Sequence, residues 1–401
     1  MRIGLDCRAM QGEGVAGIGY YIRNLVSGML DRYTDDEFVF FFEHIRSSLK
    51  DVKIGEALRR GQVIEKTEGA EYLRPNSTIR YLKLSEYKQF LPVFYSHILV
   101  GGFLRQENLD IFHGPANVVP LAFRGRIVVT VHDLAIYRHP EWFPKQYFST
   151  RVVVPQSLKV ADKIIAVSQS TKSDIVDIFK ISDSKIEVIP NGVDLAKFHP
   201  ADDKEDVFRE MVQKHKIDKP YALFLGTLEP RKNIVGLIEA WYKAFHNSRE
   251  LWNGFQLVIA GGKGWYYDEI FKKIKELKME DKVIFTGYVP EVDVPKLMQA
   301  AEVFVYPSFY EGFGLPVLEA MACGVSVITS ESSPMSEVGG QVPTYVKPKD
   351  VEGLSGALQN LLTDAAERKR LAVLGPKQAS HFTWAKTVEA THQVYEILTT
   401  S

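Results

Sequence analysis

YPSFYEGFGLPVLEAMACGVSVITS, residues 306–330, has the order of one parallel α/β unit. An apolar strand candidate ends at Pro307, a loop with two glycines follows, and Pro316 suits the first turn of a helix. Gly324 suits the C-terminal cap of that helix, and another apolar strand candidate begins at once. The N-terminus of such a helix points at the edge of the sheet, where unpaired backbone N–H groups favour an anion such as a diphosphate.

The same alternation of strands and helices extends along the whole chain. Strand candidates lie at 2–6, 37–42, 109–112, 126–131, 163–167, 185–189, 221–226, 255–260, 282–287, 302–307 and 325–330. Those of the second half are apolar along most of their length, as strands buried on both faces of a parallel sheet are. Two such arrays predict an α/β protein with two doubly wound, Rossmann-like parallel-sheet domains.

The bulk composition agrees with a two-domain globular protein. A chain of 401 residues is too long for one ordinary core, and Pro, Asn and Gly cluster at 190–200, where we expect the seam. The net charge of −1 gives no basic field that would attract nucleic acid. Asp6 interrupts any apolar run at the N-terminus, so we expect no signal peptide. The sequence contains no run of 18 apolar residues, so we expect no transmembrane helix.

Two distant cysteines, Cys7 and Cys323, predict neither a disulfide framework nor a structural zinc site. A reducing cytoplasm is the expected compartment, with attachment to the inner face of the cell membrane as an open alternative. Residues 72–104 hold many aromatic and several basic residues. From Leu82 to Leu99 the pattern predicts an amphipathic helix, which either packs on its own domain or touches a lipid or a lipid-linked acceptor.

Two carboxylates flank the glycine loop of the opening stretch. Glu311 precedes the glycines, and Glu319 lies about one turn into the predicted helix. An ionised carboxylate only accepts hydrogen bonds, so it pairs well with hydroxyl groups. A phosphate at the helix end with two hydroxyl-binding acids describes a nucleotide sugar, one acid holding the ribose and the other the sugar. The simpler alternative is that Glu319 complements the helix dipole and Glu311 is a solvated loop acid.

Further candidate residues also follow strand candidates. Arg231 and Lys232 lie where a helix begins, a place where the dipole disfavours cations, so they predict a bound polyanion; a solvated pair is the alternative. His132 and Asp133 come directly after a buried strand. His132 is therefore a candidate to donate to a sugar hydroxyl or assist proton transfer, or else a member of a structural His–Asp pair. Either Ser168 or Ser170 is expected to cap the helix that follows.

A glycine-rich loop, GEGVAGIG at 12–19, follows the first strand candidate. Gly12, Gly14 and Gly17 fit the G-x-G-x-x-G spacing, which makes an NAD-dependent oxidoreductase the rival hypothesis. That site needs a tight turn directly after the strand, yet five residues separate the strand from the first glycine. The better-supported feature is the helix start at 17–19. Gly19 is the candidate there for backbone approach to the donor diphosphate or the acceptor, and a loop that only needs glycine for its turn is the alternative.

These residues together resemble a known family. EGFGLPVLE resembles the E-x7-E signature of the retaining glycosyltransferases of family 4, which have the GT-B fold. The resemblance covers nearly the whole chain, including HD at 132–133, PNGVD at 190–194, RKN at 231–233, FTGYV at 285–289 and FTWAKTVEATHQVYEIL at 382–398. It implies an acceptor-binding N-terminal domain, 1–195, and a nucleotide-sugar-binding C-terminal domain, 196–383. The final helix, 384–401, would return to the N-terminal domain.

The resemblance also implies roles for individual residues. Arg231 and Lys232 would clamp the diphosphate, Glu319 would bind the ribose, and His132 would face the donor sugar from the other domain. The remaining donor-binding residues would be Glu311 with Gly312, Phe313, Gly314 and Leu315 at the sugar, Tyr288 and Val289 beside the base, and Gly19. Glu311, His132, Arg231 and Lys232 would form the catalytic set. The implied reaction retains the anomeric configuration, with no metal and no cofactor, and the second half contains no D-x-D motif.

The stretch HDLAIYRHPEWFPKQ, 132–146, resembles bacterial mannosyltransferases of surface polysaccharides such as O-antigen. It implies GDP-mannose as donor and a glycan or lipid-linked acceptor, with a glucosyl- or rhamnosyltransferase using a UDP or dTDP sugar as the alternative. A sugar-nucleotide epimerase or a glycogen-synthase relative is a further rival, but no lysine occurs in 1–48 to form the K-x-G-G-type loop of the latter. A non-catalytic scaffold protein is expected to have lost some of the site residues. All five are present here: Glu311, Glu319, Arg231, Lys232 and His132.

Overall fold

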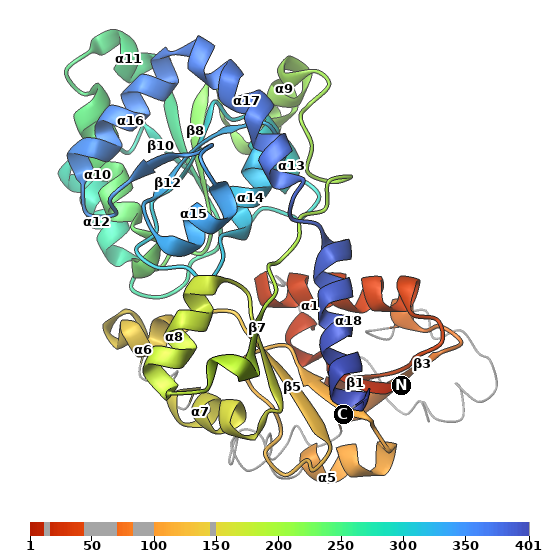
Figure 1. Ribbon diagram of the computed structural model, residues 1–401. Helices are drawn as coiled ribbons and strands as arrows, with labels where there is room; N and C mark the ends of the chain where they lie inside the picture. Colours follow the sequence, from red (N-terminus) through yellow and green to blue (C-terminus); the bar gives the residue numbers. More distant parts are fainter. Residues whose placement is uncertain (12–16, 44–69, 83–99, 145–149, 401) are drawn as a thin grey trace, which may run out of the picture.

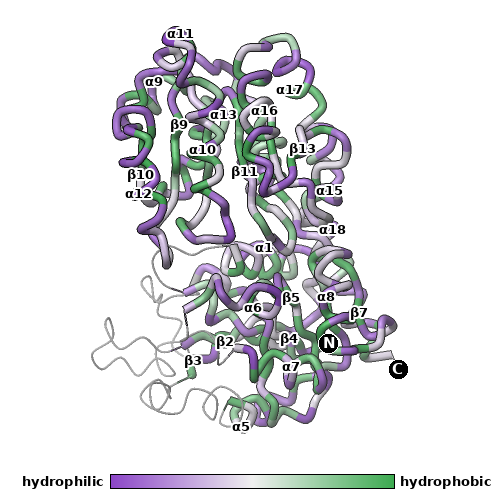
Figure 2. The backbone as a smooth tube through the Cα atoms, turned by 90° about the vertical axis from the view of Figure 1, so that its left-hand side faces the viewer, coloured by the Kyte–Doolittle hydropathy of each residue, from purple (hydrophilic) through white to green (hydrophobic). Residues whose placement is uncertain are grey.

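The computed structural model describes residues 1–11, 17–43, 70–82, 100–144 and 150–400. Two parallel sheets, each covered by helices on both faces, form two domains placed one above the other (Figure 1). Hydrophobic residues concentrate on the strands of both sheets, whereas outer helices such as α9 and α12 are largely hydrophilic (Figure 2). The predicted fold class, two doubly wound α/β domains, is confirmed.

The N-terminal sheet has seven strands in the order β3-β2-β1-β4-β5-β6-β7, and every paired neighbour runs parallel. Its strands are β1 (Arg2–Asp6), β2 (Glu37–Glu43), β3 (Ser77–Leu82), β4 (Ile111–Gly114), β5 (Arg126–Val131), β6 (Lys163–Ala166) and β7 (Ile186–Val188). Its described α-helices are α1 (Gly17–Arg32), α5 (Val100–Leu104), α6 (Ala135–Arg138), α7 (Thr150–Val160) and α8 (Gln169–Phe179). Central strands such as β5 are almost fully buried, which explains their apolar sequences.

The C-terminal sheet has six parallel strands in the order β10-β9-β8-β11-β12-β13. They are β8 (Tyr221–Leu225), β9 (Gln256–Ala260), β10 (Val283–Gly287), β11 (Val303–Tyr306), β12 (Ser326–Ser330) and β13 (Thr344–Val346). The helices that follow the interdomain linker are α9 (Lys204–His215), α10 (Ile234–Phe245), α11 (Arg249–Gly254), α12 (Asp268–Glu276), α13 (Val294–Gln299), α14 (Leu315–Ala322), α15 (Ser333–Gly339), α16 (Val351–Thr363), α17 (Ala365–Ala379) and α18 (Trp384–Thr400).

All predicted strands are present, with ends that differ by one or two residues, but two strands were missed. Both β3 and β13 lie at sheet edges, where the apolar run that marks a buried strand is absent. In β3 the exposed Arg80 interrupts the apolar pattern. The helix predicted from Leu82 is wrong at its first residue, which ends β3, and its other residues lie outside the described part of the chain.

The last helix, α18, packs against α1 of the N-terminal domain, and Tyr395 lies in the core that β1 and β2 also form (Figure 1). The chain therefore crosses between the domains twice, and the two crossings touch. The amide of Val193 donates to the carbonyl of Phe382 at 3.0 Å. A Cβ on Gly192 would lie 2.1 Å from the backbone nitrogen of Trp384, so only glycine fits. The predicted boundaries at 195 and 383 stay predictions.

Candidate active site

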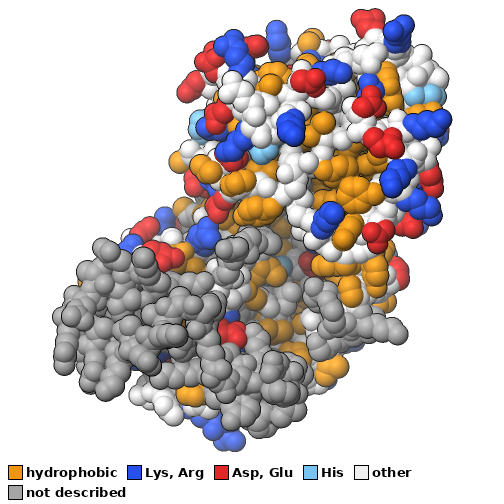
Figure 3. All heavy atoms as spheres, turned by 180° about the vertical axis from the view of Figure 1, so that it is seen from behind, with side chains coloured by type: hydrophobic (Ala, Val, Ile, Leu, Met, Phe, Trp, Pro, Cys, Tyr) orange, Lys and Arg blue, Asp and Glu red, His pale blue; other side chains and the backbone are white. Residues whose placement is uncertain are grey.

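The loop after β11 meets the end of β5 between the two domains. A Cβ on Gly312 would lie 1.6 Å from the carbonyl oxygen of His132, so this approach requires a glycine. Glu311 and His132, 179 positions apart in sequence, are therefore brought to the same place. From behind, the surface is hollowed between the domains, and hydrophobic side chains show inside the hollow (Figure 3).

Glu311 lies in a cluster of charged side chains. Its Oε1 lies 2.6 Å from Nζ of Lys232, and its Oε2 lies 3.0 Å from a terminal guanidinium nitrogen of Arg231. Nε of Arg231 also pairs with Glu229 at 2.6 Å, and Nζ of Lys232 donates to the hydroxyl of Tyr306 at 2.5 Å. Lys232, Glu229, Glu311 and Tyr306 are all buried. These two cations and two anions form a compact, neutral cluster, which we name the donor cluster.

The two cations of the donor cluster stabilise the ionised form of Glu311. Burial alone would raise the pKa of the Glu311 carboxyl, but Arg231 and Lys232 outweigh it and lower this pKa to about 2. Burial and the neighbouring Arg231 lower the pKa of Lys232, against the attraction of Glu311. Burial would likewise lower the pKa of Arg231, yet Glu311 and Asp133 hold it well above its ordinary value. The carboxyl of Glu311 is therefore ionised at neutral pH.

The donor cluster corrects two sequence interpretations. Glu311 is not a solvated loop acid, because its side chain is buried and doubly paired. Arg231 and Lys232 do lie before a helix start, in a 3-10 helix ahead of α10, but Glu229 and Glu311 already compensate their charge. Sequence reasoning missed Glu229, which directly precedes Pro-Arg-Lys. It also missed Tyr306. The available signal was a residue with a hydroxyl group at the C-terminal end of an apolar strand.

Glu319 lies on α14, whose N-cap is Gly314 and whose first turn contains Pro316, as predicted. It is the fifth residue of the helix and therefore beyond the first turn, so complementing the helix dipole does not explain it. Burial raises the pKa of Glu319 to about 8, opposed by Lys197 and reinforced by Glu291. The donor side thus contains Glu311, whose pKa is lowered, and Glu319, whose pKa is raised above neutrality.

His132 is neutral and oriented by the backbone. Its Nε2 lies 2.8 Å from the carbonyl oxygen of Pro115 and donates to it, so Nδ1 is the acceptor nitrogen. Burial lowers the pKa of His132, although the Pro115 carbonyl acts in the opposite direction. The edge of the Tyr21 ring packs against the imidazole at 4.8 Å between centroids. Asp133 accepts from the amide of Ala135 at 3.1 Å, which makes it part of its own turn.

Helix α8 contributes contacts that the sequence did not reveal. Ser168 caps this helix as expected and accepts from the amide of Thr171 at 3.0 Å. Its hydroxyl also donates across the domain boundary to the carbonyl of Gly312 at 2.6 Å. Glu337 of α15 accepts from the amides of Gln169 and Ser170 at 2.7 and 3.0 Å. The start of α8 is therefore a contact region for the C-terminal domain.

The other predicted donor residues lie in α1, after β10 and in the loop before α14. Helix α1 begins at Gly17 as predicted, with Gly19 buried in its first turn; Gly12 and Gly14 lie outside the described residues. After β10, Tyr288 is exposed and Val289 is buried. In the loop before α14, Phe313 is buried and packs edge-on against Phe382, and Leu315 is half-buried. The loop that follows β10 reaches α1, where Glu291 pairs with Arg23 at 2.8 Å.

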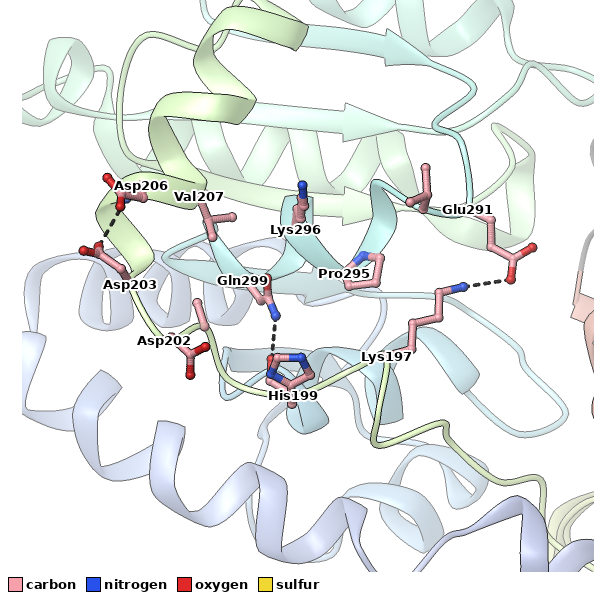
Figure 4. A pocket seen from close by; sticks show the side chains of 12 residues that line it. Lys197, His199, Asp202, Asp203, Asp206, Val207, Glu291, Pro295, Lys296 and Gln299 are labelled. Atoms are coloured by element: carbon pink, nitrogen blue, oxygen red, sulfur yellow. Dashed lines mark hydrogen bonds and ion pairs between the residues drawn. The ribbon is translucent and has the colours of Figure 1, made fainter.

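A cavity of about 780 Å³ lies away from the donor cluster, between the interdomain linker, α9 and α13 (Figure 4). Its lining includes Lys197, which pairs with Glu291 at 2.7 Å, and Gln299, whose amide donates to the carbonyl of His199 at 2.7 Å. Only the Lys197–Glu291 edge lies near Glu319. In the described part of the chain, no group of three or more His, Cys, Asp or Glu could hold a metal ion. No described helix is long and apolar enough to cross a bilayer.

Comparison with known proteins agrees with this architecture. Residues 16–197 match the family model "Glycosyltransferase Family 4", and residues 207–378 match "Glycosyl transferases group 1". The chain is 35% identical over 299 residues to the O-antigen chain mannosyltransferase B of Escherichia coli, covering 74% of this chain and 76% of that protein. It is 29% identical over 274 residues to a glycogen synthase of Mycobacterium tuberculosis, covering 67% of this chain and 62% of that protein.

Solved structures show the same fold at low sequence identity. A sucrose-phosphate synthase from Thermosynechococcus elongatus superimposes with a TM-score of 0.76 at 21% identity, covering 99% of this chain and 98% of that one. The Anabaena protein HepE, in complex with UDP and glucose, superimposes with a TM-score of 0.71 at 18% identity over the full length of both chains. With both family models and the E. coli relative in agreement, the chain belongs to the family 4 glycosyltransferases, with the GT-B fold.

Proposed function

We propose that this glycosyltransferase moves mannose from GDP-mannose to a glycan or lipid-linked acceptor in surface polysaccharide synthesis, with retention at the anomeric carbon. The observation that carries the proposal is the donor cluster, in which Glu311 is buried between two cations and opposite His132. The mannosyltransferase relative at 35% identity favours the sugar. Membership of the glycosyltransferase family argues against the rival hypothesis of an NAD-dependent oxidoreductase, which rested on the glycine spacing. A cytoplasmic location, with a peripheral membrane contact, belongs to the same proposal.

On the donor side, Arg231 and Lys232 would bind the diphosphate while Glu311 accepts hydrogen bonds from the sugar hydroxyls. The cluster is neutral without a ligand, so an incoming diphosphate adds negative charge that its own groups do not balance. The N-terminus of α14 lies on the same loop, and the helix dipole supplies positive potential there. Gly312, Phe313, Gly314 and Leu315 bring this helix end beside Glu311.

Glu319 would bind the ribose, and its raised pKa suits that task. A protonated carboxyl both donates and accepts one hydrogen bond, so it matches a pair of ribose hydroxyls without placing a further anion beside the diphosphate. Val289, buried at the end of β10, and the exposed Tyr288 would border the base. Gly19, in the first turn of α1, would approach the donor or the acceptor through its backbone.

The proposed reaction is a same-face substitution. The bond between the anomeric carbon and the diphosphate oxygen breaks, and the acceptor oxygen bonds to that carbon from the same face. The acceptor proton passes to the leaving diphosphate oxygen, so no base on the protein is needed. Arg231, Lys232 and the α14 N-terminus would stabilise the charge that develops on the diphosphate, and neither a metal nor a cofactor is part of the proposal.

A thermal-shift panel tests the donor. We expect GDP to raise the melting temperature of the protein more than UDP, dTDP or ADP at equal concentration, because only a ligand bound to the native state stabilises it. Product formation from GDP-mannose then tests the sugar. A larger shift with UDP, together with transfer from UDP-glucose, would establish the glucosyltransferase alternative, which the glycogen synthase relative favours. Stabilisation by NAD alone would contradict the proposal.

A further inference from the structure

The residues on either side of Glu311 are both held by the acceptor domain. The hydroxyl of Tyr310 donates to Oδ2 of Asp174, on α8, at 2.5 Å. On the other side, the carbonyl of Gly312 accepts from Ser168 at 2.6 Å and from Thr171 at 3.2 Å. The peptide that bears Glu311 is therefore fastened to α8 at two points.

The Tyr310 anchor is charge-assisted and buried. Asp174 is 8% exposed, and Nε of Arg138 pairs with its other oxygen at 2.7 Å. Burial first, and Asp174 second, raise the pKa of Tyr310 far above its ordinary value, so the hydroxyl stays a donor. It also accepts from the amide of Leu134 at 3.3 Å, two positions after His132. The same hydroxyl thus joins α8, the His132 segment and the Glu311 loop.

The ring of Phe309 also stacks on Trp142 at 5.9 Å between centroids, whereas several other polar contacts between the domains lie away from this loop. Glu337 binds the first amides of α8, and Nε1 of Trp265 donates to the carbonyl of Trp142 at 2.6 Å. Arg23 and Glu291 pair near the linker. These contacts hold the domains together, whereas the Tyr310 and Gly312 contacts also fix the peptide from which the Glu311 carboxylate projects. Consecutive Cα atoms are only about 3.8 Å apart, so movement at either anchor moves Glu311.

We propose that α8 of the acceptor domain is a positioning element for Glu311, with Ser168 and Asp174 as positioning residues. The donor site is then complete only while the acceptor domain is docked, and separation of the domains withdraws the carboxylate from the donor sugar. This inference rests on the proposed role of Glu311 in sugar binding. It adds that the acceptor domain controls a donor-binding group without touching the donor.

The test compares the full-length variants Tyr310→Phe and Ser168→Ala with two controls. Tyr137→Phe removes one hydroxyl that donates to the carbonyl of Thr150 at 3.0 Å within the acceptor domain, so it matches the Tyr310 change chemically. Ser168→Thr retains the γ-oxygen and serves as the conservative rescue. We expect kcat for sugar transfer to fall about tenfold in Tyr310→Phe and in Ser168→Ala, since each loses a strong hydrogen bond. The KM for the donor should change less than kcat, and both controls should keep near wild-type kcat.

Hydrogen–deuterium exchange of peptides covering 308–314 supplies a readout that needs no activity. The amide of Phe309 donates to the carbonyl of Arg231 at 2.8 Å, and we expect its exchange to accelerate in Tyr310→Phe but not in Tyr137→Phe. Unchanged exchange in both Tyr310→Phe and Ser168→Ala would overturn the inference. Faster exchange in these variants together with a wild-type kcat would also overturn it. If the wild-type protein transfers sugar from no donor, the proposed function fails, while the exchange data still decide whether α8 holds the loop.

Discussion

The two domains present opposite kinds of chemistry to the hollow between them. On the donor side, Glu311 lies within ion-pair distance of both Arg231 and Lys232. On the acceptor side, burial lowers the pKa of His132, so the imidazole that faces them is neutral. A charged, pre-paired surface suits an ionic ligand such as a diphosphate, whereas a neutral one suits hydroxyl groups. This difference fits the proposal that the two domains bind different substrates.

Behind His132 the neutral side continues as a buried hydrogen-bond network. Nε2 of His113 lies 2.8 Å from the Thr130 hydroxyl, and Nδ1 lies 2.6 Å from the Tyr395 hydroxyl. Tyr21 joins the network through Thr130 at 3.2 Å and packs against the His132 ring. Burial lowers the pKa of His113 to about 3, so no charge arises there at neutral pH. Helix α18, which contributes Tyr395, therefore supports the acceptor side from behind.

The largest expected effect comes from breaking the charged side. Lys232→Ala leaves Glu311 with one cation instead of two and removes a proposed diphosphate ligand, so we expect kcat/KM for sugar transfer to fall about 100-fold or more. Initial rates and circular dichroism measure activity and folding together. Lys243→Ala, which removes only an exposed pair with Glu352, is the matched control. Wild-type turnover in Lys232→Ala would remove the donor cluster from the mechanism.

Glu319 sharpens the comparison, because it is the neutral carboxyl on the charged side. Its pKa is about 8 in the folded protein but about 4.3 in an unfolded chain. Between these values only the folded state holds the proton, so this group makes stability fall as the pH rises from about 4 to 8. The amide of Glu319→Gln never ionises, and the variant should melt higher than wild type by roughly 5 °C at pH 9.

At pH 5 the carboxyl of Glu319 is protonated in the folded protein, so the advantage of Glu319→Gln should be much smaller. Calorimetry at both pH values measures the difference, with Glu352→Gln on the exposed surface as the control. Equal melting temperatures for wild type and Glu319→Gln at pH 9 would show that burial does not raise the pKa of Glu319.

The smallest expected effect comes from the neutral side. Tyr395→Phe leaves a buried nitrogen of His113 without its partner, which costs about 1–3 kcal/mol of the free energy of unfolding. We expect a lower melting temperature by a few degrees, with kcat reduced only about twofold, because no charge is lost. A fall in kcat as large as that of Lys232→Ala would contradict the division between the two sides.

The sequence predicted the fold well because buried parallel strands have an unmistakable apolar composition. The same local pattern named Glu311, Glu319, Arg231 and Lys232 as candidates, since each lies beside a strand end or a helix start. It could not show that Glu311 and Lys232 pair, because their positions are 79 residues apart and the alternative partner was a ligand. The contact between Ser168 and Gly312 was equally out of reach, since it depends on how two complete domains dock.

The touching crossings at Gly192 and Trp384 have a consequence for how the enzyme moves. Because the two crossings contact each other, we expect any rotation of one domain relative to the other to be centred at this place. Topologically the donor domain is an insertion into the acceptor domain, which holds both Met1 and α18. A side chain larger than hydrogen at position 192 would clash with the backbone of Trp384 and push the two crossings apart.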